Sequence, residues 1–93
     1  MIRNIYTVPG IPGILNIEVN FFASLMQYKP GGTGREFWDV MCNEGSTVVD
    51  LLNRFGVPSE DVKLIFINGL HAKDKALLKD GDRVGIFPLV GGG

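Results

Sequence analysis

The hydrophobic pattern of this chain changes from strand-like alternation to helical spacing only once. Residues 14–24, ILNIEVNFFAS, alternate apolar and polar side chains, which is typical of a strand with one buried face. Residues 45–56, GSTVVDLLNRFG, instead place apolar side chains at helical spacing. A single amphipathic helix among strands predicts an α+β fold, a mixed sheet of four or five strands with one main helix across one face.

The strand predicted over 14–24 contains one exception to its alternation. Phe22 lies on the polar face, whereas the expected buried face comprises Leu15, Ile17, Val19, Phe21 and Ala23. The Pro- and Gly-containing segment 26–34 predicts a loop. Residues 35–42 are rich in strand-forming side chains and predict a hairpin back onto the first strand, with bulky residues on both faces.

The helix has start and stop signals at both ends. Its apolar face is Val48, Leu51, Leu52 and Phe55. Thr47 and Asp50 have the spacing of a capping box, and Gly56 suits the left-handed position that ends a helix.

The remaining third of the chain predicts three further strands. Residues 62–67, VKLIFI, are apolar almost throughout, as in a central strand. Asn68-Gly69 is a strong hairpin signal and leads into a brief strand over 70–72. Residues 73–82 predict irregular or 3₁₀ structure with Leu77 and Leu78 as anchors and a tight turn at Asp80-Gly81-Asp82. In the last strand, 83–87, Phe87 falls on the polar face.

Composition indicates one globular domain and excludes several functions. The chain has 93 residues, a net charge of -1 with acids and bases interleaved, and one cysteine. It therefore has no basic face for nucleic acid and no internal disulfide. Two Pro-Gly pairs interrupt residues 1–13, so a secretory signal is not expected there, and no segment reaches the length of a membrane span. We expect a cytoplasmic protein with an N-terminal extension over 1–13, a domain over 14–88 and a flexible tail over 89–93.

Candidate catalytic and metal-binding residues are few. His71 has no second histidine or nearby cysteine, so a metal site is not expected, and we interpret it as a surface residue after the hairpin. Cys42 reads as a small buried hydrophobe because no base accompanies it. Residues 30–34, PGGTG, lack the Lys-Ser/Thr of a phosphate-binding loop.

The chain ends in FPLVGGG, and this ending suggests a chemical role. Pro88 has no amide hydrogen, so we expect the chain to leave the sheet there. A glycine carboxylate is unhindered, and a Gly-Gly end can thread a narrow channel. Once activated as an acyl-adenylate, that carboxylate becomes an electrophile. Composition alone is equally compatible with a frayed terminus.

The two phenylalanines on polar strand faces suggest a docking surface. If both strands belong to one sheet, Phe22 and Phe87 share the face away from the helix. Exposed aromatic side chains rimmed by polar groups mark partner sites.

The chain resembles the ThiS/MoaD group of ubiquitin-like sulfur carriers, which have a β-grasp fold. The resemblance runs from about Ile14 to Gly93, and the segments that carry it are VNFFASL, GSTVVDLLNRF, IFINGL and LKDGDRVGIFPLVGGG. Leu89 replaces a second proline and Gly91 stands where alanine or threonine is more usual, but neither change affects Gly92-Gly93. FFASL, the chain length and the ending are most similar to the small subunit of molybdopterin synthase.

The resemblance implies a sulfur-donating subunit with no permanently bound cofactor. A MoeB/ThiF-like activating enzyme would use ATP to adenylate the carboxylate of Gly93, and a sulfur donor would convert it to a thiocarboxylate. The tail residues Val90, Gly91 and Gly92 would thread the active site of a MoaE-like large subunit.

The resemblance also implies partner-binding positions and leaves alternatives. Phe22 and Phe87 match positions that contact the activating enzyme, and His71 is placed with them. The alternatives are a sulfur carrier for thiamine or another sulfur metabolite, a ubiquitin-like modifier joined to lysines, and an interaction module with an inert tail.

Overall fold

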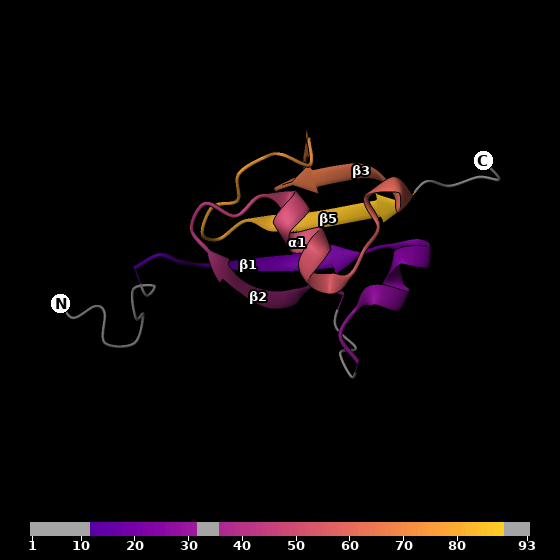
Figure 1. Cartoon of the computed structure of the whole chain (residues 1–93), viewed down its shortest axis with the longest axis horizontal. Coiled ribbons are helices and arrows are strands. Elements are labelled where there is room, and N and C mark those ends of the chain that lie inside the picture. Colours follow the sequence, from indigo (N-terminus) through magenta and orange to yellow (C-terminus); the bar gives the residue numbers. More distant parts are fainter. Residues whose placement is uncertain (1–11, 32–35, 89–93) are drawn as a thin grey trace.

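A computed structural model describes residues 12–31 and 36–88. Five strands form one mixed sheet in the order β2-β1-β5-β3-β4, and helix α1 crosses one face of it (Figure 1). This is the predicted order of elements and the predicted fold class. The elements are β1 (Ile14–Phe21), η2 (Ala23–Tyr28), β2 (Trp38–Asn43), α1 (Val48–Phe55), η3 (Ser59–Asp61), β3 (Val62–Ile67), β4 (Leu70–Ala72) and β5 (Arg83–Pro88).

Alternation in β1 builds the core, and the strand ends earlier than predicted. The four odd-numbered apolar residues of β1 are buried beneath the helix. The prediction that the strand continues to Ser24 is wrong, because Ala23 has φ +51° and begins the 3₁₀ helix η2. That turn buries Leu25 instead of Ala23. The predicted hairpin is confirmed, since β2 pairs antiparallel with β1, with Trp38 and Val40 on its buried face.

Three aromatic rings fasten the helix to the β1–β2 hairpin. Phe21, Trp38 and Phe55 pack edge-to-face in all three pairings, with ring centroids 5.1 to 5.7 Å apart. Such pairs contribute about 0.5–1.5 kcal/mol each beyond the burial of their apolar area. They fix the end of α1 over the sheet.

The capping signals of α1 are confirmed. Thr47 Oγ1 accepts a hydrogen bond from the Asp50 amide, and an Asp50 carboxylate oxygen accepts one from the Thr47 amide at 2.9 Å. Gly56 adopts φ +74°, the left-handed conformation that ends the helix. The first two helical amides, of Val48 and Val49, donate to the carbonyls of residues 76 and 74. Because its amide donors have partners within the chain, the start of α1 offers no anion site.

The second hairpin is confirmed, but β3 is not the central strand. Asn68 and Gly69 both have positive φ, as a two-residue hairpin turn between β3 and β4 requires. β3 is fourth of five strands, and of its side chains only Ile65 is fully buried. Leu64 is 39% exposed. This strand is apolar on both faces because Leu64 and Phe66 contribute to an aromatic surface on the face away from α1.

The segment between β4 and β5 is held by one of its two predicted anchors. Leu78 is buried, but Leu77 is 62% exposed and contributes only a backbone bridge to Thr47, so its predicted anchoring role is wrong. Asp82 supplies a different anchor. This buried carboxylate accepts hydrogen bonds from the Lys79 amide and from the side-chain amide of Asn68, both at 2.8 Å.

β5 is the middle strand, parallel to β1 and antiparallel to β3. Val84 and Ile86 are fully buried under α1. The prediction that the chain leaves the sheet at Pro88 is wrong by one residue, because Pro88 is buried and pairs with Val62 as the last residue of the strand. A proline is tolerated there because the β3–β5 register shifts between Val62 and Leu64, the kind of irregularity at which prolines occur in sheets.

Candidate functional site

Aromatic side chains cover the end of the sheet face away from α1. Phe22 follows β1, Phe87 ends the outward alternation of β5, and Phe66 lies on β3. The Phe22 and Phe87 rings are stacked with centroids 4.2 Å apart, and Phe66 meets Phe87 edge-on at 5.7 Å. Phe37 meets Phe22 edge-on at 6.4 Å. We call Phe22, Phe37, Phe66 and Phe87 the aromatic patch.

Gly85 lets the patch lie close to the sheet. A Cβ placed on Gly85 would lie 3.2 Å from Cε2 of Phe22 and 3.6 Å from Cε1 of Phe87. The first distance is tighter than an ordinary carbon contact, so a side chain at this position would push the Phe22 ring away. The glycine therefore positions the stacked pair over the middle strand.

Charged groups border the patch on one side. The guanidinium of Arg83 lies 4.5 Å from the centroid of the Phe37 ring and its Nε is 3.0 Å from a carboxylate oxygen of Glu18. The aromatic rings, Gly69, Gly85 and Arg83 line a hollow of about 230 Å³. An apolar hollow with a charged rim is suited to receiving a partner's side chain.

The predicted partner-binding residues lie together. Phe22 and Phe87 are in contact, and the exposed His71 on β4 joins them through Phe66, its ring centroid being 5.8 Å from that of Phe66. The tail residues Val90, Gly91, Gly92 and Gly93 lie outside the described residues, as do residues 1–11 and the loop residues 32–35. Pro88, the last described residue, follows Phe87 directly, so the patch lies where the described chain ends.

Sequence reasoning missed two members of the patch. Phe66 was missed because every other residue of β3 except Lys63 is apolar, so the sequence did not distinguish the buried face of this strand from the outward face. The register with β5 places Phe66 opposite Gly85, on the outward face. Phe37 precedes β2, where bulky side chains on both faces gave no preference.

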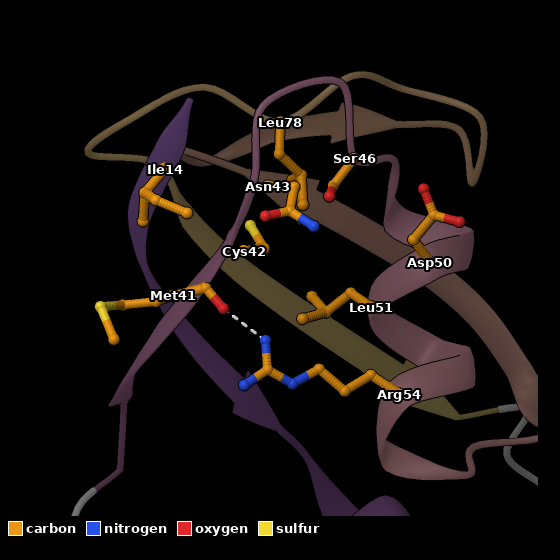
Figure 2. Close-up of a pocket in the computed structure, with 9 residues that line it drawn as sticks. All are labelled: Ile14, Met41, Cys42, Asn43, Ser46, Asp50, Leu51, Arg54 and Leu78. Carbon is orange, nitrogen blue, oxygen red and sulfur yellow. Dashed lines mark hydrogen bonds between the residues drawn. The ribbon is translucent and has the colours of Figure 1, made fainter. Parts of the chain in front are cut away.

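A second hollow, of about 440 Å³, lies between α1 and β2 (Figure 2). Arg54 reaches across from the helix and donates a hydrogen bond to the carbonyl oxygen of Met41, while the Met41 side chain points away (Figure 2). Cys42 lines this hollow and is only partly buried, so its prediction as a buried residue is corrected. Burial raises the pKa of the Cys42 thiol, although Ser46 and Arg54 act in the opposite direction.

The surroundings of Cys42 do not make it a nucleophile. A raised pKa keeps the thiol protonated at neutral pH. His71, the chain's single histidine, is on β4, whereas Cys42 is on β2, and these are the opposite edges of the sheet. Among residues 12–31 and 36–88, no three metal-ligating side chains cluster, and no helix is long and apolar enough to cross a membrane.

A family profile decides which group of proteins this chain resembles. The profile described as Mut7-C ubiquitin matches residues 14–91. The chain belongs to the Mut7-C ubiquitin family. No curated protein matches this Mut7-C ubiquitin chain. The match begins at β1, so the whole 1–13 extension lies outside it, and it includes the first tail residues.

Solved structures confirm the ubiquitin-like β-grasp fold of this Mut7-C ubiquitin. A putative molybdopterin converting factor subunit 1 from Pyrococcus furiosus is 30% identical, with a TM-score of 0.62 over 82% of this chain and 99% of that one. A Haloferax volcanii protein solved in solution is 22% identical, with a TM-score of 0.68 over 91% and 92%. Small archaeal modifier protein 1 of H. volcanii is 21% identical, with a TM-score of 0.61 over 82% and 99%. The suspected ThiS/MoaD-like relationship is thus supported.

Proposed function

We propose that this Mut7-C ubiquitin is a sulfur carrier for molybdopterin synthesis. The observation that carries the proposal is the aromatic patch, which surrounds the end of β5 and so borders the point where residues 89–93 begin. A partner docked on the patch would have its active site within reach of the terminal residues. The 30% identity to the putative Pyrococcus converting factor subunit supports the choice of pathway.

The proposed chemistry uses the terminal carboxylate as substrate. A MoeB/ThiF-like enzyme binds the patch and catalyses attack of the Gly93 carboxylate on the α-phosphorus of ATP, which forms an acyl-adenylate and releases pyrophosphate. A sulfide-equivalent donor then attacks the acyl carbon and displaces AMP, leaving a thiocarboxylate. In the cytoplasm, a MoaE-like large subunit accepts the tail and transfers its sulfur to the pterin precursor. The body of the carrier contributes docking surface and no catalytic group.

One experiment tests the carriage of sulfur. The purified chain is incubated with a MoeB/ThiF-like enzyme, ATP and sulfide, and its intact mass is measured. The expected product is heavier by the difference between sulfur and oxygen. A matched variant carries one alanine after Gly93, which leaves the fold intact but removes the glycine terminus. Thiocarboxylation of the extended variant, or an unchanged mass of the natural chain with active enzymes, would contradict the proposal.

The likeness to small archaeal modifier protein 1 favours one second candidate, a protein modifier. The same acyl-adenylate would then react with a lysine amine of a target protein. Branched peptides that carry the C-terminal glycines on lysine side chains, detected by mass spectrometry of cell extracts, would favour this function. Their absence together with thiocarboxylate formation favours sulfur carriage.

A further inference from the structure

A buried amide without a partner lies beneath the aromatic patch. Asn20 is 2% exposed, and its Oδ1 has no hydrogen-bond partner among the described residues. Leaving an amide oxygen buried and unpaired costs free energy, and an apolar residue of similar size would avoid that cost. The alternation of β1 directs Asn20 to the same outward face as Glu18, since Val19 and Phe21 are buried under α1.

Two contacts show what covers this amide. In the β1–β5 ladder, Glu18 pairs with Arg83 and Asn20 pairs with Gly85. The Phe37 ring contacts the guanidinium of Arg83 and also the ring of Phe22. Arg83 and Phe22 lie on either side of Asn20 along the strand direction, so the Phe37 ring spans the position of Asn20. Phe37 precedes β2 and is outside the sheet ladder, so its ring can turn without breaking a strand.

The hollow next to this amide selects for one kind of occupant. Its lining is aromatic apart from the glycines and Arg83, which favours a flat apolar group. Asn20 does not itself line the hollow, but its ladder partner Gly85 does, and the unpaired Asn20 oxygen can accept from a hydrogen-bond donor. The rim carries the Arg83–Glu18 ion pair, which has no net charge and leaves no free counterion for a charged donor, so the donor should be neutral. The edge of a tryptophan or tyrosine ring, an indole N–H or a phenol O–H, combines these properties.

We propose that the aromatic patch binds a tryptophan or tyrosine side chain of the activating partner. The incoming ring displaces the Phe37 ring, and its N–H or O–H group donates a hydrogen bond to Asn20 Oδ1. This inference deepens the proposed function by naming the chemistry of the docking contact. Asn20 is then a specificity-determining residue, because an apolar ring without a donor leaves its oxygen unpaired.

A pair of fragments tests the contact without any partner enzyme. The full chain, labelled with ¹⁵N, is titrated with indole and with 1-methylindole, which has the same ring but no N–H donor. Dissociation constants are taken from the chemical shifts of the Gly85 amide and the Asn20 side-chain amide. We expect indole to bind about two- to tenfold more tightly, the range given by one net hydrogen bond. Equal affinities, or shifts centred on Cys42 and Arg54 in the other hollow, would overturn the proposal.

A variant gives an independent arm of the same test. Asn20→Leu removes the acceptor while keeping a side chain of similar size, and it should bind both fragments with equal affinity. An Asn20→Leu variant that still prefers indole would show that the indole N–H donates to another acceptor, which would contradict the proposal. The titration needs neither ATP nor the terminal glycines. A chain that prefers indole but never forms a thiocarboxylate would therefore refute the proposed function while leaving this inference intact.

Discussion

The ring of Phe22 lies parallel to that of Phe87, with 2° between their planes and 4.2 Å between their centroids. Parallel stacking of the two rings brings their apolar faces together. The backbone fixes it, because the Phe22 amide donates to the carbonyl of Ile86 at 3.0 Å and so ties the end of β1 to β5. The result is a flat apolar surface formed before any partner arrives.

Removal of one ring of this pair should impair docking more than folding. Phe87→Ala is expected to raise the KM of the activating enzyme for the carrier by about tenfold or more, the effect of losing an interface hot spot. The value of kcat should change little, because the substitution removes binding and not chemistry. Since the ring is half-buried, the stability loss should be about 1–2 kcal/mol. Steady-state thiocarboxylation kinetics and urea denaturation measure the two effects.

Met41→Ala is the matched control for that substitution. Met41 is an apolar side chain on β2 that is 61% exposed and lies outside the aromatic patch. Its truncation should leave the KM unchanged. An equal rise in KM for both variants would show that general surface hydrophobicity, not the patch, attracts the enzyme.

Replacement of Asn20 should separate stability from recognition. Asn20→Leu is expected to increase the free energy of unfolding by about 1 kcal/mol or more, because it removes an unpaired buried oxygen. Chemical denaturation of the isolated chain measures this change. A marked loss of stability would indicate that the Asn20 side chain has a structural role in the free protein.

The capping box of α1 should contribute a measurable part of the stability. Thr47→Ala leaves the Asp50 amide without its acceptor and should lower the free energy of unfolding by about 1 kcal/mol. Asn53→Ala, at an exposed position of the same helix, should change it by less than about 0.5 kcal/mol. Comparable losses for both variants would mean that loss of the cap is not what sets the cost.

Among the acidic residues in turns, Asp82 should cause the largest loss of stability when it is replaced by alanine. Asp82→Ala leaves the Lys79 amide and the Asn68 side chain without an acceptor, and Asn68 Oδ1 in turn accepts from the Arg83 amide at 2.9 Å. We expect a loss of about 1–3 kcal/mol by thermal or urea denaturation. Asp74→Ala, at an exposed carboxylate, is the control and should be close to neutral.

Cys42 should react slowly with alkylating reagents. Because burial raises the pKa of this thiol above its usual value of 9.0, less thiolate is present at any pH below that range. Iodoacetamide should modify it more slowly than a free cysteine at pH 8. The folded protein holds this proton more tightly than the unfolded chain, so the Cys42 contribution to stability is complete below pH 9 and is lost as the pH rises through the raised pKa. A rate equal to that of free cysteine would contradict this environment.

Much of the fold follows from local sequence signals. The cap at Thr47, the left-handed Gly56 and the Asn68-Gly69 turn each act within a few residues, so they could be predicted without tertiary information. The placement of Phe22 and Phe87 on one face followed from alternation together with the assumption that both strands belong to one sheet. The stacking itself required the β1–β5 register, which is a long-range property.

The errors arose where tertiary contacts override local pattern. Alternation continued through Ala23, but burial of Leu25 is achieved by the 3₁₀ turn η2. The apolar run of β3 matched a central strand, although two of its residues, Leu64 and Phe66, serve the outer surface. Alternation assigned Asn20 to the polar face of β1 and so predicted that it faces solvent, and nothing local shows that it is buried.

The central position of β5 also has a mechanical consequence. β1 and β3 flank this strand, so a pull applied at Pro88 acts along the strand and loads the ladders on both sides together, in shear. An edge strand would instead be peeled away one bond at a time. A force applied at this end of the described chain therefore meets a body that resists extraction of its middle strand.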